Sequence, residues 1–120
     1  MGAAENERLG RAWLDAFNRR DLEALLGLYA EDCVHTSPKL RVQRPETRGE
    51  VRGKAALRSW WADAFARLPA LRYEGLSLTA DEDRVVLEYL RHVPGEASLP
   101  VLELFETREG RIVASRVFHG

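Results

Sequence analysis

Three ionisable side chains in this sequence have the types needed for acid and base chemistry. His35 and His119 lie near the ends of two predicted strands, and Glu103 lies on a third. Imidazole changes its charge near neutral pH, so two such rings in one cavity would form an acid and base pair without a metal. We therefore predict His35 and His119 as proton carriers, with Glu103 as their orienting partner. The alternative for either ring is structural, a buried histidine bonded to a backbone carbonyl.

A second group of side chains is suited to lining a pocket for an apolar ligand. Helical spacing or strand alternation turns its members towards one interior: Trp13, Phe17, Tyr29, Ser37, Trp60, Trp61, Tyr89, Val113, Ser115 and Val117. Adjacent Trp60 and Trp61 cannot point the same way, so we expect one in the core and the other in the cavity or at a subunit contact. Core packing of both is the alternative. Tyr89 alternates with Leu87 and Arg91, which places a cation on the same strand face.

Composition excludes several classes of protein. The 120 residues fit one domain, residues 1–120, with enough apolar residues for a single core. The 18 basic and 19 acidic side chains nearly cancel, so net charge gives no hold on nucleic acid or an anionic membrane. No apolar run approaches the roughly 20 residues that span a bilayer, and no apolar signal core opens the chain. We therefore expect a cytoplasmic protein.

The sequence gives no support for a metal centre. Cys33 is the only cysteine, which excludes an internal disulfide and the commonest zinc sites. Cys33, His35, His119 and a glutamate could be combined into a ligand set, but they lack the paired spacing of metal ligands. We predict neither a metal nor a cofactor.

The first half of the chain has the spacing of helices. Apolar residues recur at helical intervals over residues 5–19 and 54–68, and Asp21 is suited to cap a short helix whose apolar face extends to Tyr29. Residues 33–37 then favour a short strand that carries His35. The charged residues 39–53 include two glycines and a proline, and we expect a solvated loop there.

The second half has the pattern of an antiparallel meander. Residues 71–78, 84–92, 99–107 and 111–119 are rich in Val, Leu, Phe and Tyr, and short turn-forming links separate them. Such links favour hairpins over helical crossovers. Three helices followed by these strands predict an α+β fold, in which a curved sheet wraps around the helices.

The orientation of Glu103 depends on the last hairpin. If Glu109-Gly110 form a two-residue turn, Glu103 faces outward. If Arg108-Glu109-Gly110 form a three-residue turn with a left-handed glycine, Glu103 and Phe105 move to the face of Val113. The second arrangement is favoured, because Arg-Glu-Gly fits a type I turn followed by a glycine bulge.

Several residues of these elements occur together in one superfamily. They are Asn18-x-x-Asp21, Leu25, Leu28-Tyr29, Asp32, Val34, Pro38, Gly53-Lys54-Ala55-Ala56-Leu57 and Glu109-Gly110-Arg111-Ile112-Val113. Over almost its whole length the chain resembles the nuclear transport factor 2-like superfamily, in its SnoaL-like and ketosteroid isomerase-like branch. The resemblance implies a cone, a bent sheet closed by three helices around a mostly apolar cavity, commonly in homodimers packed through the sheet. Members include isomerases, polyketide cyclases, epoxide hydrolases, dehydratases and non-catalytic binding modules, so the fold does not choose a chemistry.

The chain departs from the isomerases at positions that carry their chemistry. Their base lies just before the proline that ends the first strand, where this chain has Ser37, whose hydroxyl takes no proton from carbon unless another group activates it. Their helix-1 tyrosine falls near Trp13, whose indole can donate one hydrogen bond but cannot exchange a proton. Their protonated aspartate falls near residues 101–103.

We expect a small-molecule enzyme of the SnoaL-like kind that performs proton transfer, cyclisation or water addition on an apolar ligand, without a cofactor. The alternative is a non-catalytic ligand-binding or dimerisation module of the same fold. The expected partners are an apolar small molecule and a second copy of the chain through the sheet, with neither nucleic acid nor a membrane among them. An adaptor for other proteins would need an exposed apolar patch that the sequence does not reveal.

Overall fold

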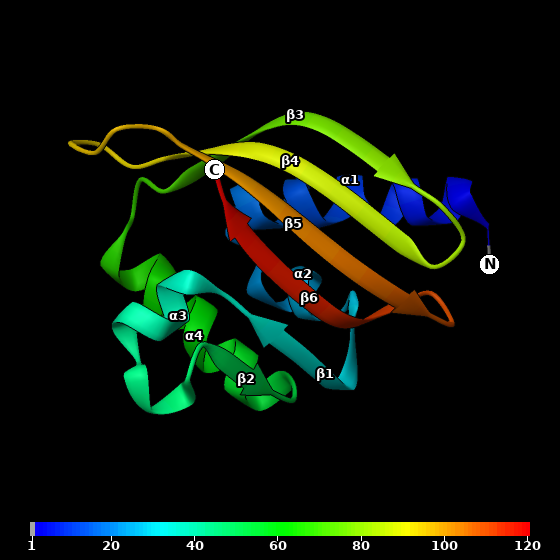
Figure 1. The fold of residues 1–120 in the computed structure, drawn as a ribbon, viewed down its shortest axis with the longest axis horizontal. Helices are drawn as coiled ribbons and strands as arrows, with labels where there is room; N and C mark the ends of the chain where they lie inside the picture. Colours follow the sequence, from blue (N-terminus) through cyan, green and yellow to red (C-terminus); the bar gives the residue numbers. More distant parts are fainter. Residues whose placement is uncertain (1) are drawn as a thin grey trace.

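Six strands form one curled, unclosed sheet around the helices (Figure 1). The computed structural model describes residues 2–120. The helical segments are α1 (Ala3–Asn18), α2 (Leu22–Leu26), α3 (Pro38–Gln43), the 3-10 helix η1 (Pro45–Thr47) and α4 (Lys54–Arg67). The strands are β1 (Tyr29–Thr36), β2 (Glu50–Arg52), β3 (Arg72–Ala80), β4 (Arg84–His92), β5 (Leu99–Arg108) and β6 (Arg111–His119).

The sheet is mixed, with the strand order β2-β1-β6-β5-β4-β3. Strands β1 and β6 run parallel, and every other neighbouring pair runs antiparallel. Helix α1 packs on β3 and β4, whereas α4 packs on β1 and β2 (Figure 1). The predicted α+β fold, in which a curved sheet wraps around the helices, is confirmed. Among the described helices, none is both long and apolar enough to cross a membrane.

Helix α1 buries the apolar stripe that its sequence predicts. Leu9, Trp13 and Phe17 are all buried against the sheet. Gly10 also faces the sheet, and a Cβ there would come within 2.6 Å of Leu78 Cδ1. The missing side chain therefore allows the close approach of helix and sheet.

Helix α2 is shorter than the sequence predicts. Asp21 caps it as expected, and its carboxylate accepts a hydrogen bond of 3.0 Å from a backbone amide of the first turn. Tyr29, expected on the apolar face of this helix, instead begins β1. It pairs with Ile112 of the parallel strand β6, so a contact distant in sequence extends the predicted strand 33–37 towards the N-terminus.

Residues 39–53, predicted as a solvated loop, contain all of η1 and β2 and all of α3 except Pro38. The prediction of a loop is therefore wrong. Ser37 caps α3 and Pro38 lies in its first turn, a combination typical of helix starts. Leu40 is fully buried and Val51 is nearly so. These two isolated apolar residues anchor a segment whose many charges otherwise resemble those of a loop.

The last hairpin combines features of both predicted turns. Glu109-Gly110 form a two-residue turn in which both residues have positive φ, 54° and 76°. Val113 is then an extra residue in β6, because its neighbours pair with two consecutive residues of β5. This bulge restores the inward face, so Glu103 pairs with Val117 and is buried. The favoured inward position of Glu103 is confirmed, but by a bulge in β6 instead of a three-residue turn.

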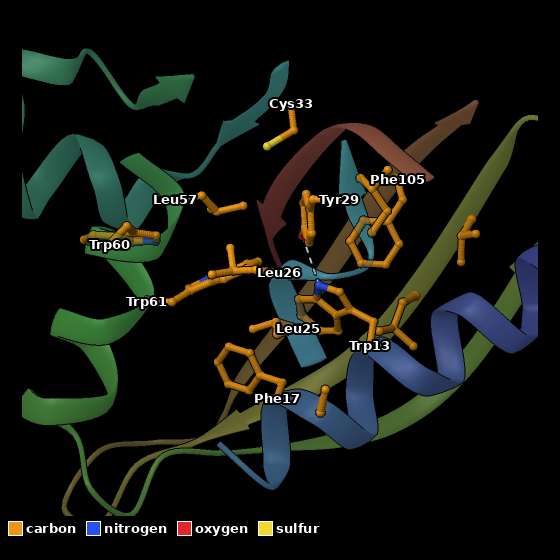
Figure 2. Packing of buried hydrophobic residues seen from close by; sticks show 14 of the residues in the cluster. Trp13, Phe17, Leu25, Leu26, Tyr29, Cys33, Leu57, Trp60, Trp61 and Phe105 are labelled. Carbon is orange, nitrogen blue, oxygen red and sulfur yellow. Dashed lines mark hydrogen bonds between the residues drawn. The ribbon is translucent and has the colours of Figure 1, made fainter. Parts of the chain in front are cut away.

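The core joins the helices to the inner face of the sheet (Figure 2). The ring centroids of Trp13 and Phe105 lie 5.2 Å apart. Those of Trp61 and Tyr29 are also 5.2 Å apart, with the two ring planes at 70°. Nε1–H of Trp13 donates a hydrogen bond of 3.0 Å to the hydroxyl of Tyr29 (Figure 2). This bond fixes α1 to β1 through two buried side chains.

Candidate functional site

A cavity of about 140 Å³ lies between the inner face of the sheet and the helices. A space of this size holds a molecule of about one aromatic ring. The predicted site residues that line it are His35, His119, Glu103, Trp13, Phe17, Ser37, Trp60, Trp61, Tyr89 and Val117. The predicted set therefore includes half of the residues that line this cavity.

Strand register orders the polar groups of this wall from the mouth inward. Arg91 lies in the outermost row, and Tyr89 and His119 lie in the next row, since both pair with the same residue of β5. Glu103 lies one row deeper, and His35 lies one row deeper again. Because side chains on one face recur every second residue, successive rows are separated by roughly 7 Å.

Glu103 is a buried carboxyl group with only one of its oxygens satisfied. It is 2% exposed, and the hydroxyl of Tyr89 donates a hydrogen bond of 2.8 Å to its Oε1. Its Oε2 has no hydrogen-bond partner among the described residues. Burial raises the pKa of Glu103 to about 8, and the Tyr89 bond opposes part of that rise. At neutral pH this side chain is therefore mainly a neutral acid that can donate a proton in a hydrogen bond.

His35 is held by a hydroxyl group from the neighbouring strand. Its Nδ1 lies 2.6 Å from Oγ of Ser115, and the ring is 3% exposed. Burial lowers the pKa of His35 to about 4, so the imidazole is neutral at physiological pH. In the tautomer whose Nδ1–H donates to Oγ of Ser115, Nε2 is the nitrogen that can accept a proton from a molecule in the cavity.

Glu103 is not the orienting partner of either histidine, which corrects the predicted role. Its carboxyl group bonds Tyr89, whereas Ser115 bonds His35. His119 lies two rows from His35 along the sheet, nearer the mouth. The two imidazoles line one cavity at different depths and form no direct pair.

The mouth of the cavity carries positive charge. Arg91 is 9% exposed and donates a hydrogen bond of 3.0 Å from Nη1 to Oε1 of Glu96, while half-buried Lys39 lies nearby on α3. Burial and the charges of Lys39 and Arg91 lower the pKa of His119. Two cations therefore face the same histidine from α3 and β4.

Stacked aromatic rings form the wall beside α1. The ring centroid of Tyr73 lies 3.9 Å from that of Phe17 and 4.1 Å from that of Tyr89, with the ring planes at 9° and 25°. Trp13 stacks on Phe17 with a centroid distance of 5.4 Å. Flat faces of this kind suit planar apolar ligands. Tyr73 is the largest wall residue that the predicted set omits, although its alternation with buried Leu71 signals an inward face.

Three predicted site residues do not line the cavity. Tyr29 and Ser115 are buried behind its wall, where they bond Trp13 and His35 respectively. Val113 lies in the hairpin bulge, so it borders a surface groove beside the β5–β6 turn. The bulge turned this one residue away from the face that it would share in a regular strand.

The two positions at which the chain departs from the isomerases have local structural roles. The hydroxyl of Ser37 accepts a hydrogen bond of 3.2 Å from the backbone amide of Lys39 and so caps α3. The indole N–H of Trp13 is taken by Tyr29. Ser37 therefore supplies no base to the cavity, and Trp13 supplies no free hydrogen-bond donor, in contrast to the residues at these positions in the isomerases.

Trp60 and Trp61 are both nearly buried and both line the cavity, so the expectation that only one of them would do so is wrong. The ring centroids of Trp61 and His35 lie 6.0 Å apart with their planes at 62°, and the guanidinium carbon of Arg44 lies 5.6 Å from the ring centroid of Trp60. Trp61 thus lies beside His35, the candidate base, while Trp60 lies beside the cation Arg44. Among residues 2–120, no cluster of three His, Cys, Asp or Glu side chains is placed to hold a metal ion.

Solved structures with this fold are numerous. A SnoaL-like protein of unknown function from Burkholderia thailandensis E264 matches with a TM-score of 0.87 and 29% identity, covering 98% of this chain and 95% of that one. A provisionally assigned ketosteroid isomerase from Kribbella flavida DSM 17836 matches with a TM-score of 0.81 and 19% identity, over 98% and 79% of the two chains. A provisionally assigned polyketide cyclase from Sinorhizobium meliloti matches with a TM-score of 0.77 and 21% identity, over 92% and 94%.

No curated protein matches the chain. The model of the SnoaL-like domain matches residues 10–115, which include the whole cavity wall of β4 and β5 and its main aromatic residues. The matched region also contains His35 and Glu103. The chain therefore belongs to the SnoaL-like domain family, within the nuclear transport factor 2-like superfamily.

Proposed function

We propose that this protein is an enzyme that binds a small apolar carbonyl compound and catalyses proton transfer at the carbon next to the carbonyl group. Cyclisation and water addition are related reactions of the same acid and base pair. One observation carries the proposal. A buried carboxyl group with a free oxygen, Glu103, lines the same small cavity as His35, an imidazole that Ser115 holds by its other nitrogen.

In the proposed reaction, Glu103 donates a hydrogen bond from its protonated carboxyl group to the carbonyl oxygen of the substrate. With the imidazole proton on Nδ1 and donated to Ser115, Nε2 of His35 removes a proton from the adjacent carbon, and the resulting enolate is stabilised by the Glu103 hydrogen bond. Return of the proton to a different carbon completes an isomerisation. Alternatively, attack of the enolate on a second carbonyl group closes a ring, and protonated His35 returns its proton to the alkoxide that forms. Side chains supply both proton positions, so the scheme uses no cofactor.

The environment supports these roles. Burial keeps Glu103 neutral and therefore able to donate, and it keeps His35 neutral and therefore able to accept. His119 at the mouth would exchange protons with solvent. The base differs in type and position from the one in the isomerases, because Ser37 occupies that position.

Deuterium exchange tests the proposal without knowledge of the natural substrate. A thermal-shift screen of small ketones, epoxides and polyketide-like acids identifies binders, and NMR in D₂O follows exchange at the carbon beside each carbonyl group. His35→Gln should slow exchange by roughly 10²- to 10⁴-fold with little change in binding, because the base is lost. Glu103→Leu should slow it by roughly 10²- to 10³-fold, and Glu103→Gln should recover part of the loss, since an amide still donates.

Glu106 offers a matched control on the same strand. It lies on the outer face and pairs with Arg116, so Glu106→Gln should leave exchange unchanged. Exchange that survives in both the His35→Gln and Glu103→Leu variants would contradict the proposal.

The second candidate is a passive ligand-binding module. It is favoured by the small cavity and by the use of Ser37 as a helix cap instead of a base. Compounds that raise the melting temperature strongly but show neither exchange nor turnover would support this alternative.

We also propose that two copies of the chain pack through the outer face of the sheet. Leu102 and Phe118 pair across β5 and β6 on that face, and they are 38% and 50% exposed. Such neighbouring apolar side chains are costly in water and are suited to an interface.

A further inference from the structure

The mouth of the cavity has a cation whose hydrogen-bonding capacity is mostly unused. Arg91 is 91% buried, since only 9% of it is exposed, and its guanidinium has five N–H donors. Among residues 2–120, its side chain makes one hydrogen bond, from Nη1 to Glu96. The other donors of Arg91 are accessible, because none of them is among the buried polar atoms that lack a partner, so this side chain is suited to a further acceptor.

The internal partner of Arg91 is only a weak competitor for that role. The side chain of Glu96 is 48% exposed and lies in the β4–β5 connection, whereas the side chain of Arg91 is 11% exposed. A carboxylate that stays half in water gains little from a single contact of this kind. A ligand anion could therefore share Arg91 with Glu96 or displace it.

A second cation strengthens the attraction for an anion. Lys39 on α3 also lines the cavity, and it takes part in none of the ion pairs formed among the described residues. Arg67 lies at the same cavity, but Asp63 on the preceding turn of α4 compensates its charge. With Glu103 neutral, the charge that remains around the mouth is positive.

We propose that the molecule bound in this cavity is a small organic acid, with an apolar body of about one ring and a carboxylate or similar anion held by Arg91 and Lys39. The inference rests on the proposed function, because it takes the cavity to be the substrate site. The row order places the anion at the mouth, and the apolar body then lies along Tyr73 and Tyr89. The opposite end of such a molecule points towards Glu103, where a carbonyl group would be activated.

Phenylacetate and phenylacetamide form a suitable pair of probes, since they differ mainly in charge. Calorimetry at pH 7 and low salt should show phenylacetate binding at least tenfold more tightly than the amide. Arg91→Gln should remove this preference by weakening only phenylacetate. Glu96→Gln, at an exposed position, should tighten phenylacetate severalfold and leave the amide unchanged, because it removes the internal competitor.

Arg84→Gln is the control, since Arg84 belongs to the same strand but is exposed and outside the cavity. Equal binding of the two probes to the native chain would overturn the inference, as would a Glu96→Gln variant that binds both probes unchanged. The Glu96 arm keeps the test decisive even if Arg91→Gln impairs folding. Charge-selective binding with no proton exchange in any ketone would refute the proposed function alone, whereas exchange in neutral ketones without charge selectivity would refute this inference alone.

Discussion

The hydroxyl of Tyr89 donates a hydrogen bond to Oε1 of Glu103 across two neighbouring strands, while Oε2 of the same carboxyl group has no partner among the described residues. Burial destabilises the carboxylate ion, and the single hydrogen bond from Tyr89 offsets only part of that cost. The pKa of Glu103 is therefore raised from 4.5 to about 8. The shift links the site to the pH dependence of folding.

Glu103 should make the protein less stable as the pH rises. Between pH 4.5 and about 8 the unfolded chain has released the Glu103 proton and the folded chain has kept it, so the free energy of unfolding falls with pH. One proton corresponds to a slope of about 1.4 kcal/mol per pH unit. In Glu103→Gln this falling contribution should disappear. Urea unfolding at a series of pH values measures it as the difference between native chain and variant, and an unchanged slope between pH 6.5 and 8 would contradict it.

His35 should act in the opposite direction over a lower range. Its pKa falls from 6.5 to about 4 on folding, so between these values the unfolded chain binds a proton that the folded chain does not. Its contribution to stability therefore rises with pH by about 1.4 kcal/mol per unit over this window. From pH 4.5 to 6.5 the opposite contributions of Glu103 and His35 to the free energy of unfolding should nearly cancel in the native chain. His35→Gln should expose the falling contribution of Glu103 alone, and an unaltered pH profile would show that His35 is accessible and titrates normally.

Tyr29 was expected at the ligand, but the structure makes it the acceptor for Trp13. Tyr29→Phe should leave a buried indole N–H without a partner and cost about 1–3 kcal/mol of stability. The same variant should bind phenylacetate with unchanged affinity, because Tyr29 lies behind the cavity wall. Unfolding in urea gives the first quantity and calorimetry the second. A double-mutant cycle with Trp13→Phe isolates the bond, and a coupling energy near zero would mean that it contributes nothing.

Local patterns were sufficient for most elements of the fold and for the inward wall of β4. Strict alternation of Leu87, Tyr89 and Arg91 predicts their common face, and the structure places all three inside. The Asp21 cap is likewise a local device that sequence displays directly. In these regions, each residue's position follows from its immediate neighbours.

Other features depend on contacts between distant parts of the chain. Tyr29 begins a strand because Ile112 lies opposite it in parallel β6, and no residue near Tyr29 signals that pairing. Val113 leaves the cavity because a bulge absorbs one residue in β6. Ser115 was expected at the ligand, but register with His35 makes it the support for that ring. It was therefore easier to predict which residues lie at the site than to predict which residues each of them bonds.

The outer face of the sheet makes a prediction about assembly. If two copies pack through Leu102 and Phe118, a charge at the second position would be buried without a partner. Phe118→Glu should weaken the dimer by about 2 kcal/mol or more, roughly 30-fold in the dissociation constant. Sedimentation velocity across a dilution series measures this shift.

Val42 supplies the matched control for that experiment. It is an apolar side chain, 72% exposed on α3, and therefore lies outside the proposed interface. Val42→Glu adds the same charge and should leave the dimer intact. Phenylacetate affinity should be similar in the native chain and in both variants, because neither substitution touches the cavity wall. A native chain that sediments as a monomer, or equal weakening by both substitutions, would rule out the sheet face as the interface.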